Sequence, residues 1–341
     1  MKAARGVQAI NTAWALAEEA EVSFVPAAFK RGTIEFYGLK GRSPYIRPLS
    51  RCLGPFNSQL FFLWRALPLV RACEIVFTRH LKTAWWLCKL KALHHRPVVY
   101  EAHEIFAQKG EKLSREREVF FRSSGLVFIS KGLRQAVERK FAPPSHVPRT
   151  VIPSGTKLIS VDLVKHHRPV QEIVYLGTFR YPWKGEDLLL EVASRLPPNL
   201  RLKIYGDPPS RNHPGVVYAG YVVPGQIGRV LCQAQIAIFP ISSRQEIARH
   251  YTSPMKLLDY MAAGCAIVAS DLPSVREIVS EKEALLVPPD DPEAFVAGIQ
   301  KLASGQRLRF SLAQAAHRRA RDFTWEKRAQ KLYNFLQEVV S

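Results

Sequence analysis

A short motif in the second half of the chain has residue types suited to binding a phosphate group. It reads Tyr251-Thr-Ser-Pro-Met-Lys-Leu-Leu-Asp-Tyr-Met-Ala-Ala-Gly264. We expect Ser253 to cap a helix that starts at Pro254, because a serine oxygen accepts first-turn N–H groups and proline fits the first helical position. The backbone N–H groups of Met255 and Lys256 would then point out of the helix N-terminus. Such an end binds phosphate through its aligned donors and the helix dipole.

An acidic residue follows on the same predicted helix. Asp259 lies about one turn beyond the helix start, and its carboxylate could accept hydrogen bonds from ribose hydroxyls, as acidic residues do in dinucleotide-binding folds. Gly264 is expected to end the helix, before a strand over 266–270. The same pattern also fits a well-capped helix that binds no ligand, and the motif alone leaves both interpretations open.

A second candidate site is the loop between a predicted strand, 172–176, and a predicted helix, 186–195. Loops that follow the strands of an open α/β sheet are where such folds bind ligands. Arg180 and Lys184 could hold a pyrophosphate, because the negative charge on a leaving diphosphate is stabilised by cations. An exposed turn with incidental charge is the alternative. The sequence contains no Gly-x-Gly-x-x-Gly or Walker motif, which disfavours nicotinamide chemistry and ATP hydrolysis.

The elements that must position these residues follow an α/β pattern. The chain has 341 residues, 47% of them hydrophobic and 23% charged, which fits two soluble domains. Short apolar runs alternate with longer amphipathic stretches in both halves, as in parallel sheets with crossover helices. The polar stretch 157–169 is the predicted linker, and 324–340 is a predicted amphipathic helix. The chain opens into a predicted helix, 6–20, where a Rossmann-like half usually begins with a strand.

Cysteine usage and hydropathy favour a cytoplasmic protein. The five cysteines are scattered and form no Cys-x-x-Cys pair, so neither a disulfide framework nor a zinc site is indicated. No apolar run approaches the roughly 20 residues that span a bilayer, and the best candidate, 60–70, is interrupted by Arg65. The first residues lack the pattern of a signal peptide.

The net charge of +20 is concentrated in the first half. Residues 1–160 contain 26 Lys and Arg against 11 Asp and Glu, whereas residues 161–341 contain 23 against 18. A basic face attracts nucleic acid, anionic lipid or phosphorylated substrates. No recognition-module motif supports nucleic acid. The stretch 56–95 mixes aromatic and basic residues, which suits an interfacial helix on an anionic membrane surface and also suits ordinary core packing.

Taken together, the two candidate sites resemble the donor domain of retaining glycosyltransferases of family four. The resemblance covers 174–325, and its pieces stand in the expected order: Tyr-Leu-Gly177, Lys184-Gly185, Ile204-Tyr-Gly206, Tyr218-Ala-Gly220-Tyr221, Ala234, Phe239-Pro240, the motif ending at Gly264, Ala-Ile-Val-Ala-Ser270, Val-Arg-Glu277-Ile, Leu-Leu-Val-Pro288 and Phe323-Thr-Trp325. The first half is similar more loosely, through Tyr100-Glu-Ala-His103-Glu and Val151-Ile-Pro-Ser-Gly155.

This resemblance implies a GT-B fold, with two Rossmann-like domains facing a central cleft. Residues 1–160 would form the acceptor-side domain and 161–324 the nucleotide-sugar donor domain. A C-terminal helix, 325–341, would cross back to the first domain.

The resemblance also implies a role for each matching residue in the donor domain. Lys184, with Arg180, would hold the donor diphosphate, and the amides around Ser253, Met255 and Lys256 would meet the distal phosphate or the sugar. Asp259 stands where the family's second glutamate binds ribose.

Further implied positions complete the site. Gly206 and the backbone at Tyr221 would line the base pocket, and His103 would face the donor sugar and assist catalysis, although a structural histidine is the alternative. The family's first acidic position is occupied here by Tyr251, which cannot carry a negative charge at neutral pH. Glu246 is close in sequence, but its spacing does not match.

The implied reaction is transfer of a sugar, with retention, from a nucleoside diphosphate sugar to a hydroxyl acceptor, with neither metal nor cofactor. The acceptor would be a lipid-linked or cell-surface glycan of a bacterium, such as lipopolysaccharide, capsule or exopolysaccharide. The basic half could hold the enzyme on the inner face of the membrane. The alternatives are a nucleotide-sugar epimerase-like enzyme, an inactive homologue and a basic binding protein.

Overall fold

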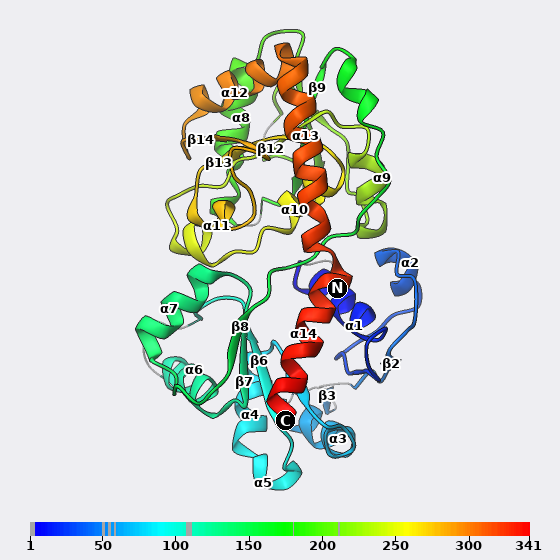
Figure 1. Cartoon of the computed structure of the whole chain (residues 1–341), viewed down its shortest axis with the longest axis vertical. Helices are drawn as coiled ribbons and strands as arrows, with labels where there is room; N and C mark the ends of the chain where they lie inside the picture. The colour runs from blue at the N-terminus through cyan, green and yellow to red at the C-terminus, as the bar shows by residue number, and fades with distance from the viewer. Residues whose placement is uncertain are drawn as a thin grey trace. The chain divides into compact units, whose positions relative to one another are not determined.

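A computed structural model describes residues 4–49, 52–53, 56–57, 59–106, 111–179, 181–210 and 212–341. The chain divides into two compact units (Figure 1). The first unit contains Met1–Pro153 together with Trp325–Ser341, and the second contains Ser154–Thr324. The architecture is therefore α/β, with one parallel sheet at the centre of each unit.

The main sheet of the first unit has four parallel strands in the order β5-β6-β7-β8. They are β5 (Val76–Thr78), β6 (Val98–Ala102), β7 (Gly125–Phe128) and β8 (Arg149–Val151). Every residue of β6 and β7 is buried, as expected of apolar strands in a parallel sheet that is covered on both faces. Two small sheets accompany it: β1 (Ser23–Phe24) with β2 (Tyr45–Ile46), and β3 (Cys52–Leu53) with β4 (Phe56–Asn57).

The helices of the first unit are α1 (Ala4–Leu16), α2 (Thr33–Tyr37), α3 (Gln59–Ala72), α4 (Leu81–Lys89), α5 (Lys91–His94), α6 (Glu111–Arg122), α7 (Lys131–Phe141) and α14 (Trp325–Val340). The predicted return of the C-terminal helix is confirmed, because α14 lies beside α1 in this unit (Figure 1). Its apolar side chains Leu332 and Phe335 share a core with Val99 of β6 and Val127 of β7.

The second unit is built on six parallel strands in the order β11-β10-β9-β12-β13-β14. They are β9 (Glu172–Gly177), β10 (Arg201–Gly206), β11 (Val216–Tyr218), β12 (Ile236–Phe239), β13 (Ala266–Ser270) and β14 (Leu285–Val287). Its helices are α8 (Glu186–Arg195), α9 (Ile227–Leu231), α10 (Met255–Ala262), α11 (Pro273–Arg276), α12 (Pro292–Ser304) and α13 (Gln306–Ala320). Two apolar clusters fill the core, one involving α10 and the other α8 and α12.

The strand order of the second unit reverses next to β9. From β9 the chain builds outward through β10 and β11, then returns to place β12 on the other side of β9. The loops that leave the carboxyl ends of β9 and β12 therefore begin side by side at this point. Open α/β sheets bind ligands at such a reversal, and both candidate motifs of the second half follow these two strands.

The polar stretch predicted as a linker, 157–169, is instead part of the second unit. Lys165 and His166 within it are buried. The ammonium group of Lys165 donates to the carbonyl of Ala263 at 2.8 Å, and the His166 ring lies 2.9 Å from the carbonyl of Gly264. The polar residues thus satisfy carbonyl groups at the C-terminal end of α10, a role that a composition-based linker prediction does not anticipate.

Candidate functional site

The loops that follow β9 and β12 touch each other at the strand reversal. Lys184 ends a short turn in the first loop, and Gly185 follows with a left-handed φ of 75°. A Cβ atom at Gly185 would lie 2.1 Å from the carbonyl oxygen of Pro240, so only glycine allows this approach. The amide of Ser242 also donates to the carbonyl of Trp183 at 3.2 Å. These contacts fix Lys184 at the switch point of the sheet.

Lys256 projects from the first turn of α10 into the same region. Its ammonium donates to the hydroxyl of Tyr175 at 2.9 Å and lies 4.2 Å from the centre of that ring, an arrangement that favours a cation. Burial lowers the pKa of Lys256 well below its ordinary value, and the neighbouring charge of Lys184 lowers it further. Burial also lowers the pKa of Lys184.

The two lysines form a cationic pair that lacks a counter-charge. Within the described part of the chain, no carboxylate lies close enough to form an ion pair with Lys184 or Lys256. Two desolvated ammonium groups repel each other, and an anion bound between them would remove that repulsion. The arrangement is therefore suited to holding a diphosphate.

The start of α10 differs from the prediction by one residue. The helix begins at Met255, and Pro254 precedes it without a side-chain cap, so the predicted N-cap at Ser253 is wrong. The hydroxyl oxygen of Ser253 instead accepts a hydrogen bond from the amide of Ser154 at 2.8 Å, which takes the serine away from the helix. The first N–H groups of any helix lack an acceptor within it, so Met255 and Lys256 stay predicted phosphate donors.

Asp259 lies one turn further along α10 and is paired with a threonine. Its Oδ1 accepts a hydrogen bond from the hydroxyl of Thr156 at 2.7 Å. Burial raises the pKa of Asp259 to about 7, even though this hydrogen bond favours the ionised form. A carboxyl group with a raised pKa can be protonated more readily than an exposed one, so it could accept from or donate to a ribose hydroxyl. Nothing in the sequence pointed to Thr156.

Gly206 ends β10 in a position that excludes any side chain. A Cβ atom there would lie 1.9 Å from the carbonyl oxygen of Gly177, and its φ is 128°. Its carbonyl accepts from the Tyr218 hydroxyl at 2.9 Å, and its amide donates to Gly220 at 3.0 Å. Tyr221, the next residue, is 46% exposed.

Glu246 contacts Tyr251, although its spacing in the sequence does not match that of the family's first acidic residue. The segment after β12 contains a π-helix, Ile247–Tyr251, directly preceded by Glu246. The hydroxyl of Tyr251 donates to the Glu246 carboxylate at 2.5 Å. A π-helix closes its hydrogen bonds between residues five apart, and such single turns are frequent at functional sites.

His103 lies in the first unit, directly after β6. Its Nε2 is 2.5 Å from Glu101 Oε1, and its Nδ1 is 3.3 Å from an Nη atom of Arg79. Burial lowers the pKa of His103, despite the adjacent carboxylate. Glu101, beside His103 in the sequence, was a secondary candidate together with Glu104, whereas Arg79 and Arg328, which pairs with Glu101, were not predicted as site residues. Arg180, a predicted diphosphate ligand, lies outside the described residues.

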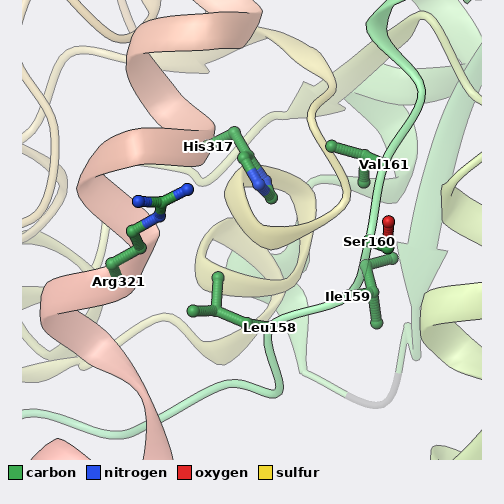
Figure 2. Close-up of a pocket in the computed structure, with 6 residues that line it drawn as sticks. All are labelled: Leu158, Ile159, Ser160, Val161, His317 and Arg321. Atoms are coloured by element: carbon green, nitrogen blue, oxygen red, sulfur yellow. The ribbon is translucent and has the colours of Figure 1, made fainter.

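A pocket of about 490 Å³ lies elsewhere on the second unit (Figure 2). It is lined by Leu158, Ile159, Ser160, Val161, His317 and Arg321. None of these residues belongs to the candidate sites, and the His317 ring already lies 3.0 Å from the carbonyl of Ala262. The switch-point lysines, not this pocket, carry the chemistry that the motifs indicate.

The described residues contain no group of three or more His, Cys, Asp and Glu side chains that could hold a metal ion. Among the same residues, no helix is both long enough and apolar enough to cross a membrane.

The second unit is similar to a family of known proteins. Residues 170–305 match the family described as glycosyl transferases group 1. A phosphatidyl-myo-inositol mannosyltransferase of Mycolicibacterium smegmatis is 27% identical over 192 residues, which is 51% of this chain and 48% of that protein. The chain thus spans about half the length of this curated relative.

Solved structures match the whole fold. A sucrose-phosphate synthase from Thermosynechococcus elongatus has a TM-score of 0.74 at 17% identity, covering 99% of this chain and 94% of that one. Anabaena HepE in complex with UDP and glucose has a TM-score of 0.77 at 14% identity, covering 99% and 97%. HepE with UDP-glucose has a TM-score of 0.76 at 14% identity, covering 98% and 96%. The predicted GT-B fold is confirmed.

Proposed function

We propose that this chain transfers a sugar from a nucleoside diphosphate sugar to a hydroxyl acceptor, because residues 170–305 match the family described as glycosyl transferases group 1. The observation that carries the proposal is the uncompensated pair Lys184 and Lys256, held at the strand reversal beside the N-terminus of α10. A bound diphosphate would supply the missing negative charge.

Each donor group has a proposed partner. Lys184 and Lys256, with Arg180, hold the diphosphate, and the first amides of α10 at Met255 meet the distal phosphate or the sugar. Asp259 binds a ribose hydroxyl. Gly206 and Tyr221 line the base pocket, where the exposed tyrosine ring offers a stacking surface.

We propose that bond cleavage proceeds without a metal ion and with retention at the anomeric carbon. As the bond between the sugar and the diphosphate breaks, negative charge grows on the leaving diphosphate. The two lysines and the helix N-terminus stabilise that charge in a partly desolvated site. They therefore stabilise the transition state more than the bound donor, which lowers the activation barrier. His103 is proposed to contribute a contact to the sugar.

We propose a uridine diphosphate sugar as the first donor to test. The structure of HepE with UDP-glucose supports this choice by similarity of fold. We further propose a lipid-linked or cell-surface glycan acceptor in a bacterium. The similarity to a mannosyltransferase named for phosphatidyl-myo-inositol supports an acceptor with a lipid part.

A lipid-linked acceptor suits a basic and partly apolar face on the first unit. On α3, Leu60 and Trp64 are one turn apart and are 49% and 71% exposed. Between Gln59 and Arg96 the chain has seven Lys or Arg residues and one acidic residue. Exposed tryptophan beside basic residues favours an anionic lipid surface, so we propose peripheral binding at the inner face of the cytoplasmic membrane.

A thermal-shift panel tests the donor site. UDP, GDP, ADP, TDP and CMP are compared on wild type, Lys184→Ala and the control Lys301→Ala, which changes an exposed lysine of α12. A ligand that binds the folded state raises its melting temperature. We expect one nucleoside diphosphate, UDP first, to stabilise wild type and the control but not Lys184→Ala. If no nucleotide stabilises wild type, the proposed donor site is wrong.

The product of the reaction separates the alternatives. An epimerase-like enzyme would convert the donor sugar without an acceptor, whereas a transferase releases the nucleoside diphosphate only as a sugar is transferred or hydrolysed. An inactive homologue would bind the nucleotide and release nothing. Binding to RNA with steep salt dependence, without nucleotide binding, would instead favour a basic binding protein.

A further inference from the structure

Four side chains of the first unit close a hydrogen-bonded ring at the carboxyl end of β6. Glu101 Oε1 lies 2.5 Å from His103 Nε2 and accepts from Gln8 Nε2 at 3.3 Å. Arg79 donates to Gln8 Oε1 at 3.2 Å and contacts His103 Nδ1 at 3.3 Å. The ring thus joins α1, the residue after β5 and the end of β6.

The ring leaves one arrangement of protons on the imidazole. Arginine has only donors, so His103 Nδ1 must accept from Arg79 and cannot carry a proton. The ionised carboxylate of Glu101 has only acceptors, so His103 Nε2 must carry the proton. Although burial alone would raise the pKa of Glu101, the surrounding cations, Arg328 foremost, hold it well below its ordinary value.

Arg328 anchors this ring from the C-terminal helix. Its Nη2 pairs with the second carboxylate oxygen of Glu101, and both side chains are 2% exposed. Its Nη1 donates to the carbonyls of Ile152 and Pro153, each at 2.7 Å, and its Nε donates to the Thr12 hydroxyl at 3.1 Å. One guanidinium thus fixes the Glu101 carboxylate against α1, α14 and the end of β8.

We propose that Arg328 is a positioning residue that fixes His103 as a neutral imidazole with its proton on Nε2. The charged groups that face His103 are Glu101 on β6, Arg79 after β5 and Arg328 on α14. With Arg328 present, the negative charge of the Glu101 carboxylate is already balanced, so a protonated His103 is not required to stabilise that charge. Without it, the buried carboxylate would retain its charge most readily by drawing a second proton onto His103.

The consequence for catalysis rests on the proposed function. An imidazole whose two nitrogens are both engaged cannot exchange a proton with a substrate until the ring opens. His103 would therefore transfer no proton, and the pH profile of sugar transfer would lack an imidazole titration. The C-terminal helix would act on the active site only indirectly, because Arg328 positions His103 through Glu101 and touches no substrate.

Nuclear magnetic resonance of the full chain labelled with ¹⁵N-histidine tests the proposal without any donor. The His103 signal is identified by its loss in His103→Asn. In wild type we expect one neutral tautomer, protonated on Nε2, that does not titrate around the ordinary histidine pKa of about 6.5. In Arg328→Met we expect the pKa of His103 to rise by about one pH unit or more.

Three further variants make the result decisive. Arg328→Gln keeps an N–H donor but loses the charge, so it replaces Arg328→Met if that variant does not fold. Arg328→Lys keeps the charge and should restore the wild-type signal. Lys331→Met removes an exposed charge from the same helix and should change nothing. The proposal is overturned if wild-type His103 titrates as an ordinary imidazole, or if a folded neutral Arg328 variant keeps the wild-type signal. Since no donor is added, neither result depends on the proposed function.

Discussion

The hydroxyl of Tyr251 donates a hydrogen bond to the carboxylate of Glu246 at 2.5 Å. In an α-helix each residue turns by about 100°, so residues five apart point in different directions. The π-helix over Ile247–Tyr251 has a wider turn and brings positions five apart onto one side. The pair lies directly before α10. We therefore propose that its carboxylate lies on the side of the donor site where the sugar binds.

This pair leads to a prediction about sugar recognition. Glu246→Gln removes the negative charge and should lower kcat/KM for the sugar donor by about 10-fold to 100-fold, while UDP alone binds as before. Tyr251→Phe should have a smaller effect, because the carboxylate stays in place. Steady-state kinetics with UDP-glucose, alongside UDP titrations, measures both. Equal losses for UDP and for the sugar donor would mean that the pair does not read the sugar.

A second prediction concerns the pH dependence of stability through Asp259. Its folded pKa of about 7 lies above the ordinary value of 3.8, so ionising it costs the folded state free energy as pH rises between these values. Asp259→Asn should therefore unfold at a higher temperature than wild type at about pH 8, and the difference should shrink toward about pH 5. Thermal denaturation across this range checks it, and a constant difference would contradict it.

Binding of a diphosphate should take up a proton. The pKa of Lys256 is well below its ordinary value in the free protein, because of burial and the charge of Lys184. A bound anion offsets both causes and raises that pKa, so the neutral amine form of Lys256 gains a proton from solvent. Calorimetric titration with UDP in two buffers of different ionisation enthalpy measures the uptake, which should disappear in Lys256→Met. Proton release on binding would contradict the lysine-pair interpretation.

Two glycines allow a matched test of the backbone near the proposed base pocket. Gly206→Ala places Cβ against the carbonyl of Gly177, whereas a Cβ at Gly220 meets no atom within 4 Å, although both residues have positive φ. We expect Gly206→Ala to lower the free energy of unfolding by about 2–4 kcal/mol and Gly220→Ala by about 1 kcal/mol. Urea denaturation of the two variants compares them. Equal losses would mean that strain in φ, not the close approach, limits Gly206.

The α3 face predicts binding to anionic vesicles. Trp64→Ser should reduce sedimentation with vesicles of mixed phosphatidylglycerol and phosphatidylcholine by several fold, because the exposed indole anchors at the lipid interface. Tyr45→Ser is the control, since Tyr45 is 60% exposed on the same unit but lies on β2. Wild-type binding should fall as salt increases. A loss of equal size in both variants would argue against a specific face.

Most elements of the second unit could be predicted from the sequence. Helix 186–195 and strands 216–218 and 266–270 have the predicted bounds, because apolar periodicity and turn residues agree there. Helix α13 was not predicted, since its basic and alanine-rich sequence lacks a strong apolar stripe. Strand β14, Leu285–Val287, was also not predicted.

Only those residues of the candidate site that lie within local sequence motifs could be predicted. The motif before Gly264 located Lys256 and Asp259, but not their partners Tyr175 and Thr156, which are distant in sequence. Glu101 was noticed only as a neighbour of His103, whereas Arg328 is 227 residues away from it. Contacts of this kind depend on how the chain returns to its first unit.

That return has a consequence for synthesis on the ribosome. The second unit is one continuous segment, whereas the core of the first unit needs Leu332 and Phe335 from α14 beside Val127. The emerging first unit therefore exposes an apolar face of its sheet until the last residues leave the exit tunnel. Its native state becomes accessible only once α14 has emerged, and the second unit, although made after Pro153, can complete its fold first.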